Sequence, residues 1–125
     1  MTIDRLRRYC AQKGGALESY PFDQVTLVFK VERRMFALLN ETSSPPRVNL
    51  KCDPSLARDL RAAFSAILPG YHMNKEHWNT VLLDGSVPDG QVEWLIDHSY
   101  DLVAHRPKGR RRGRGAPPPE RSPER

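Results

Sequence analysis

Residues 25–39 read VTLVFKVERRMFALL, and this stretch decides the fold. In its first seven residues apolar side chains recur at every second position, which is typical of a strand with one buried face. Three charged residues at 32–34 interrupt the pattern, and 35–39 return as a second, nearly continuous apolar strand. Two strands this close form a hairpin. Its turn lacks the Asn-Gly or Gly-Gly pair that tight turns prefer, which predicts a wider or strained turn with the arginine pair exposed at its tip.

The rest of residues 1–105 predicts three helices and three further strands. Thr2 and Asp53 are suitable N-caps, and Pro54 and Pro88 mark helix starts. The expected helices span about 3–13, 54–68 and 88 onward, and the expected strands 47–52, 71–73 and 78–83. The order α-β-β-β-α-β-β-α is typical of an α+β fold with two layers, an antiparallel sheet with helices on one face. The helix residues expected to be buried against the sheet are Leu56, Leu60, Phe64, Ile67, Val92, Leu95 and Ile96.

The net charge of +5 is unevenly distributed along the 125 residues. Residues 106–125 carry eight Lys and Arg against two Glu, a net charge of +6, whereas residues 1–105 carry twelve bases and thirteen acids, a net charge of −1. The tail holds five prolines and a Gly-Arg run, so we expect a domain over 1–105 and a disordered basic tail over 106–125. A nearly neutral domain argues against a strongly cationic globular DNA-binding protein.

The composition indicates a soluble, cytoplasmic protein. The N-terminus has no apolar run of the signal-peptide type, and no stretch is long and apolar enough for a membrane span. Cys10 and Cys52 are far apart and in no metal-ligand spacing, so we expect two small core residues and neither a disulfide nor a zinc site.

Residues 71–81 read YHMNKEHWNTV, the densest cluster of chemically versatile side chains in the chain. His72, Asn74, Lys75, His77 and Trp78 offer both apolar contact and hydrogen bonds. A structural role is an equally good explanation for most of them, since Trp78 can pack against the sheet and Asn74 can close a turn. A turn lysine packs little, so Lys75 is the better candidate for ligand binding. No nucleophile stands beside the histidines and no third ligand joins them, so we expect no catalytic site, metal site or cofactor.

The chain closely resembles the MmcQ/YjbR family, above all in Tyr71–Lys75 with His77, Trp78 and Val81. Further similar segments are Tyr20–Phe22, Val28–Val31, Met35–Leu38, Leu50–Pro54, Asp84–Asp89 and Ile96–Tyr100. The resemblance implies a compact two-layer "double wing" fold, a DNA-binding role and no enzymatic activity. The polar residues it matches are Lys30, Lys51, His72, Asn74, Lys75, His77, Trp78, Asp97 and His98. The chain departs from the family pattern at Glu32–Arg34, where a glycine-containing turn is usual, at Gly90, and in its basic tail.

Two functions remain open. The first is a non-catalytic module that binds nucleic acid, double-stranded DNA in particular, with low specificity through backbone phosphates. The residues expected to bind are Lys30, Arg47 and Lys51 of the sheet, the cluster His72, Asn74, Lys75, His77 and Trp78, and Arg110, Arg111, Arg112 and Arg114 of the tail. The second is a pocket at the His72–Trp78 cluster that holds a small anionic ligand or an acidic segment of a partner.

Overall fold

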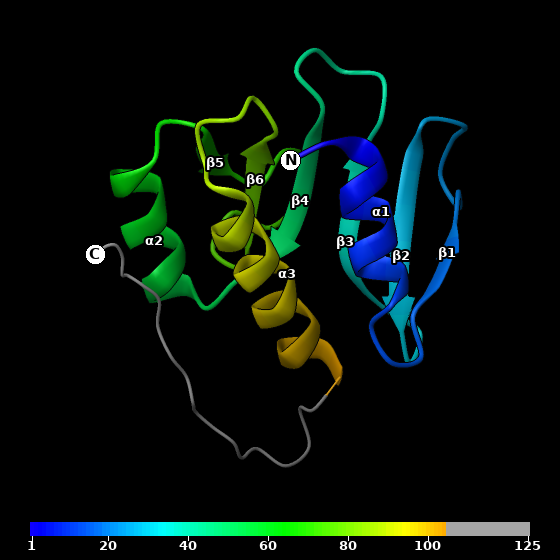
Figure 1. Cartoon of the computed structure of the whole chain (residues 1–125). Helices are drawn as coiled ribbons and strands as arrows, with labels where there is room; N and C mark the ends of the chain where they lie inside the picture. Colours follow the sequence, from blue (N-terminus) through cyan, green and yellow to red (C-terminus); the bar gives the residue numbers. More distant parts are fainter. Residues whose placement is uncertain (105–125) are drawn as a thin grey trace.

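The three central strands form as the alternation predicts. In the computed structural model, which describes residues 1–104, β2 runs Thr26–Val31, β3 Arg34–Asn40 and β4 Arg47–Lys51, each antiparallel to the next. Three short strands extend this centre, namely β1 (Leu17–Ser19), β5 (Ile67–Pro69) and β6 (Trp78–Leu82). The result is one six-stranded antiparallel sheet in the order β1-β2-β3-β4-β6-β5 (Figure 1).

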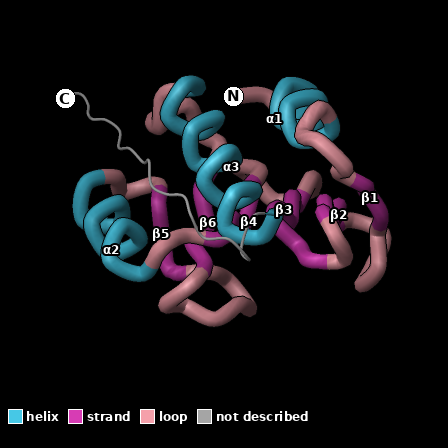
Figure 2. Tube along the Cα trace, turned by 90° about the horizontal axis from the view of Figure 1, so that it is seen from below, coloured by secondary structure: helices cyan, strands magenta, loops and turns pink. Residues whose placement is uncertain are grey.

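The three helices lie on one face of this sheet, as Figure 2 shows. They are α1 (Ile3–Ala11), α2 (Pro54–Ala63) and α3 (Asp89–Ala104). The side chains of Thr2 and Asp53 cap the first two, accepting hydrogen bonds from the amides of Arg5 (3.1 Å) and Leu56 (3.2 Å). The main core lies between α1, α3 and the sheet, with Phe29, Phe36 and Ile96 fully buried. The predicted α+β class and two-layer architecture are therefore confirmed, with β1 as an additional short strand.

The second helix is shorter than predicted. It ends at Ala63, and Phe64 is extended (φ −127°, ψ 121°), so Ile67 and Leu68 belong to β5. Apolar residues at 64, 67 and 68 fit a helix stripe as well as a short strand, and pairing with β6 decides for the strand. Of the side chains predicted to be buried, Leu56 and Phe64 are only partly buried at the edge of the core.

The predicted strand at 71–73 is wrong, because this segment is part of a loop between β5 and β6. Gly70 allows the close approach that starts the loop: its amide donates to the Trp78 carbonyl (2.9 Å), and a Cβ there would lie 2.7 Å from the Trp78 Cβ. The loop then crosses to the sheet face opposite the helices.

The turn between β2 and β3 is tight rather than wide. It consists of Glu32 and Arg33, with φ of 51° and 70°, since Val31 already pairs with Arg34. Two positive φ values are what a two-residue primed turn requires, and they are unfavourable for side chains other than glycine. The predicted strain and exposed arginines are confirmed, and the wider turn is not.

Strands β3 and β4 separate at one end. Their pairing ends at Ala37 and Leu50, and beyond this pair the buried Ser99 of α3 bridges the two strands. Its hydroxyl donates to the Phe36 carbonyl (2.6 Å) and accepts from the Lys51 amide (2.9 Å). A helix residue thus satisfies the backbone groups that the separated strands leave unpaired.

Candidate functional site

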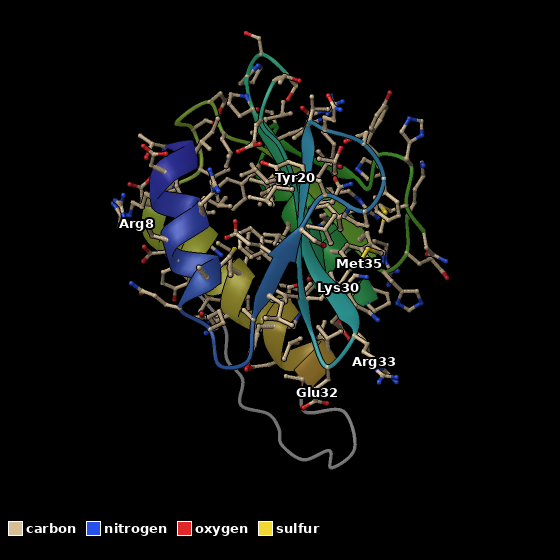
Figure 3. All side chains as sticks on the ribbon, turned by 90° about the vertical axis from the view of Figure 1, so that its right-hand side faces the viewer. Arg8, Tyr20, Lys30, Glu32, Arg33 and Met35 are labelled. Carbon is tan, nitrogen blue, oxygen red and sulfur yellow. The ribbon has the colours of Figure 1, made fainter. Side chains whose placement is uncertain are left out.

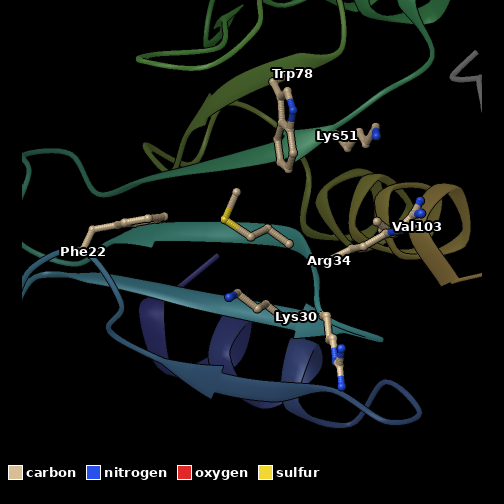
Figure 4. A pocket seen from close by; sticks show the side chains of 8 residues that line it. Phe22, Lys30, Arg34, Lys51, Trp78 and Val103 are labelled. Atoms are coloured by element: carbon tan, nitrogen blue, oxygen red, sulfur yellow. The ribbon is translucent and has the colours of Figure 1, made fainter.

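A groove on the helix-free face of the sheet lies where β3 and β4 separate. Its volume is about 420 Å³, and Figure 4 shows the residues around it. They come from the loop before β2 and from β2, the hairpin turn, β3, β4, β6 and the end of α3: Phe22, Lys30, Arg33, Arg34, Met35, Lys51, Trp78 and Val103. Because the strands diverge here, the Val103 side chain of α3 reaches the groove from the helix side of the sheet.

Four of the eight lining residues are cations, and none is a carboxylate. The alternation of side chains along the strands explains the position of the two lysines. Lys30 pairs with Met35, and Lys51 pairs with Trp78. Both lysines therefore lie, each beside an apolar partner, on the helix-free face of the sheet, called the open face below. The strained hairpin turn brings Arg33 and Arg34 to the same place. Within residues 1–104, none of the six ion pairs includes any of these four cations.

On the helix side of the molecule, several cations are paired with acids. Arg5 of α1 pairs with Asp89 (2.9 Å) and Glu93 (3.0 Å) of α3, and Lys13 pairs with Asp97 (2.7 Å). Figure 3 shows Arg8 of α1 and the groove residues Lys30 and Arg33 on opposite sides of the sheet. The net charge of −1 over residues 1–105 is therefore compatible with a local positive patch at the groove.

Trp78 is the one residue of the 71–78 cluster that lines the groove. It is also nearly buried, in a small apolar cluster with Val28 and Leu38 on the open face, against which Met35 and Met73 pack. Trp78 therefore packs in the apolar cluster with most of its side chain, and its remaining surface faces the groove.

The rest of the cluster is outside the groove lining. The Asn74 carboxamide oxygen accepts from the amides of Glu76 (2.9 Å) and His77 (3.3 Å), which closes the turn. The Lys75 ammonium donates to the Gly70 carbonyl (3.2 Å), so this lysine contributes to the loop as well as to its charge. His72, at φ 60°, and His77 are exposed.

Arg47 lies on the open face near the start of β4. Its guanidinium is 4.4 Å from the centre of the Tyr71 ring, and the Tyr71 ring contacts that of His72 (4.0 Å between ring centres, 49° between planes). Asn49 holds this loop by donating to the Tyr71 carbonyl (3.1 Å). Arg47 therefore adds positive charge to the face without lining the groove.

Several sequence-based expectations concern other parts of the molecule. Cys10 and Cys52 are free and buried, as predicted, and burial raises the pKa of each thiol to about 12. No group of three or more His, Cys, Asp or Glu within residues 1–104 could hold a metal ion. None of the helices in this range is long and apolar enough to cross a membrane. Arg110, Arg111, Arg112 and Arg114 lie outside the described residues.

Sequence reasoning missed Phe22, Arg33, Arg34, Met35 and Val103 as residues of this groove. The arginines were predicted at an exposed tip, but nothing in the sequence showed that the tip borders the groove. Only the order of strands and the Ser99 bridge bring Val103 beside Lys51, and neither can be inferred from spacing.

Comparisons with known proteins agree on one family. The family model YjbR matches residues 11–102. The uncharacterized protein YjbR of Escherichia coli K12 is 46% identical over 105 residues, covering 84% of this chain and 89% of its own length. The uncharacterized protein YyaQ of Bacillus subtilis is 46% identical over 56 residues, covering 45% of this chain and 47% of its own.

Solved structures show the same fold. The Deinococcus radiodurans protein DR2400, of the domain family DUF419, superimposes with a TM-score of 0.81 at 45% identity, covering 86% of this chain and 82% of its own. A crystal structure of a Pseudomonas syringae protein gives a TM-score of 0.72 at 29% identity, with coverages of 82% and 99%.

Proposed function

The chain belongs to the YjbR family, and from the basic groove of its open sheet face we propose that it is a non-catalytic module that binds nucleic acid, DNA in particular, through backbone phosphates. The observation that carries the proposal is the set of four cations around one groove without a carboxylate among its lining residues. Phosphate contacts require positive donors and read no sequence, so the binding has low specificity.

This local positive patch answers the objection raised by the nearly neutral domain. A polyanion that approaches the open face meets Lys30, Lys51 and the hairpin arginines, while the acids of α3 lie on the other side of the sheet, several of them in ion pairs. Local potential, rather than net charge, steers such an encounter.

The charge available to a polymer extends beyond the groove at two places. Arg47 lies farther along the open face, beside Tyr71. Val103 lines the groove in the last turn of α3, so the chain continues from there toward the arginines at 110–112 and 114. We propose that tail and groove bind one nucleic acid together, with the tail supplying additional phosphate contacts.

A second candidate is a small anionic ligand. Pockets for small molecules are commonly about 300 to 1,000 Å³, and the groove is within that range. The groove is better suited to this role than the His72–His77 loop, because its cations surround a common volume whereas the Asn74 and Lys75 side chains bond to the backbone of their own loop.

The direct test compares two double variants of the full chain in binding to a fluorescent DNA duplex at low salt. Lys30→Gln with Lys51→Gln removes two groove cations, and we expect an affinity loss on the order of tenfold. The matched control, Arg8→Gln with Arg58→Gln, removes two exposed cations of α1 and α2, which lie on the helix side of the sheet, and should lose far less. Equal losses would show that only total charge matters and would contradict a role for the groove. Saturable phosphate binding without any duplex binding would favour the small-ligand candidate.

A further inference from the structure

We infer that the groove holds an unpaired nucleobase, so that the protein binds single-stranded nucleic acid in preference to a duplex. This inference rests on the proposed function and specifies its substrate. The middle of the groove is lined by apolar side chains. A surface that contacted phosphates alone would need no apolar side chains.

The lining divides into two chemical parts. Lys30, Arg33, Arg34 and Lys51 supply positive charge, and Phe22, Met35, Trp78 and Val103 supply apolar surface between them (Figure 4). A single strand presents the same two parts, with phosphates that require cations and bases that stack on apolar and aromatic surfaces. In a duplex the bases are stacked and paired inside, so a duplex can use only the charged part.

The separation of β3 and β4 gives the base a place to enter. Beyond the Ala37–Leu50 pair the strands no longer bond to each other, and Ser99 satisfies their backbone from the helix side. At this gap the groove is lined by Met35 of β3, Lys51 of β4 and, from the helix side, Val103 of α3. A volume of about 420 Å³ is sufficient for a base with its sugar, since sites for molecules of that size begin near 300 Å³.

Phe22 is the residue that a single strand would use most directly. It precedes β2 in the loop at one end of the groove, and its ring is 64% exposed and therefore accessible to a base. Trp78 and Met35 are held in place by the apolar cluster of the open face, so a base would meet a preformed surface. Glu18, the one acid of the neighbouring strand β1, pairs with Arg7 of α1 and so does not oppose the phosphates.

The test uses the full chain carrying Trp94→Phe, which leaves Trp78 as the one tryptophan and its fluorescence as a report on the groove. The probes are an oligodeoxythymidine of about twelve nucleotides, a duplex of the same length, thymidine monophosphate and inorganic phosphate. We expect the single strand to quench Trp78 saturably and to bind about tenfold more tightly than the duplex. In the same background, Phe22→Ala should lower single-strand affinity about tenfold and duplex affinity much less. The control Leu68→Ala removes another exposed apolar side chain, on β5 outside the groove lining, and should change neither.

The outcomes separate this inference from the proposed function. Equal affinities for single strand and duplex, both reduced by Lys30→Gln with Lys51→Gln, would overturn the base pocket and leave phosphate binding in place. Thymidine monophosphate binding as tightly as the oligonucleotide would overturn it in favour of a mononucleotide site. Binding of neither polymer would overturn both proposals.

Discussion

His98 joins α3 to the start of α2 through a single ring. It stacks on Trp94 (5.2 Å between ring centres, 11° between planes), and its Nε2 accepts the Asp53 amide (3.2 Å). Burial lowers the pKa of His98, while the charges of Asp53 and Asp101 raise it in part. The folded protein therefore favours the neutral His98 ring, because only the neutral form can accept the hydrogen bond from the Asp53 amide.

This arrangement predicts how stability depends on pH. The pKa of His98 is lower in the folded protein than the roughly 6.5 of an unfolded chain, so the unfolded state binds the proton more readily. The contribution is fully present above about pH 6.5 and is lost as pH falls toward the folded pKa. His98→Gln should give a flatter profile of unfolding free energy between about pH 7 and 5, measured by urea denaturation. A slope identical to that of the unaltered protein would contradict the role assigned to His98.

At the same scale, single residues show what sequence could predict of the site. Lys30 and Lys51 were predicted together on the open face because strand parity alone sets their side. Trp78 could be chosen as a candidate from its residue type, but the sequence did not show that it lies at the groove. Phe22 and Val103 carried no signal, since a loop residue and the end of a helix meet the groove only through tertiary structure.

The β2–β3 hairpin combines strain with charge at the scale of an element. Glu32 and Arg33 occupy left-handed backbone conformations that cost about 1 kcal/mol each relative to glycine. Arg33, one of these two strained residues, also lines the groove. The hairpin turn therefore places a positive charge at the groove in a backbone conformation that lowers stability.

Two substitutions in this turn separate the effects. Arg33→Gly should raise the unfolding free energy by about 1 kcal/mol and weaken DNA binding, because it relieves the strain and removes a groove cation. Glu32→Asn should also stabilise, since asparagine tolerates this conformation, but it should leave binding unchanged or stronger. Denaturation and duplex titration of both variants provide the measurement. Destabilisation by both would show that the turn is not strained.

Helices and strands were predictable where the pattern of apolar residues fitted only one type of secondary structure. Strands β2, β3 and β4 followed from alternation, and the starts of α1 and α2 from capping residues. The end of α2 and strand β5 were not predictable, because Phe64, Ile67 and Leu68 satisfy either period. Strand β1 has three exposed residues and no alternation to detect. The separation of β3 from β4 depends on Ser99, which is distant from both strands along the chain.

At the scale of the whole molecule, two regions compete to explain any binding of DNA. The tail carries eight cations, twice the number around the groove. Affinity alone cannot separate them, because each cation that meets a phosphate releases counterions in the same way. The dependence of affinity on salt can separate the two regions, because its slope reports the number of phosphates that the protein neutralises. If the groove binds DNA, removing its cations must lower that number.

The most direct test of the groove is therefore a salt titration of duplex affinity for the full chain and for one variant, in which Lys30, Arg33, Arg34 and Lys51 are all replaced by Gln. The slope of log affinity against log salt should become shallower by about 3 to 4 units, near 0.9 for each phosphate that the variant no longer neutralises. The same slope for both proteins would contradict the account and assign the binding of DNA to other cations of the chain.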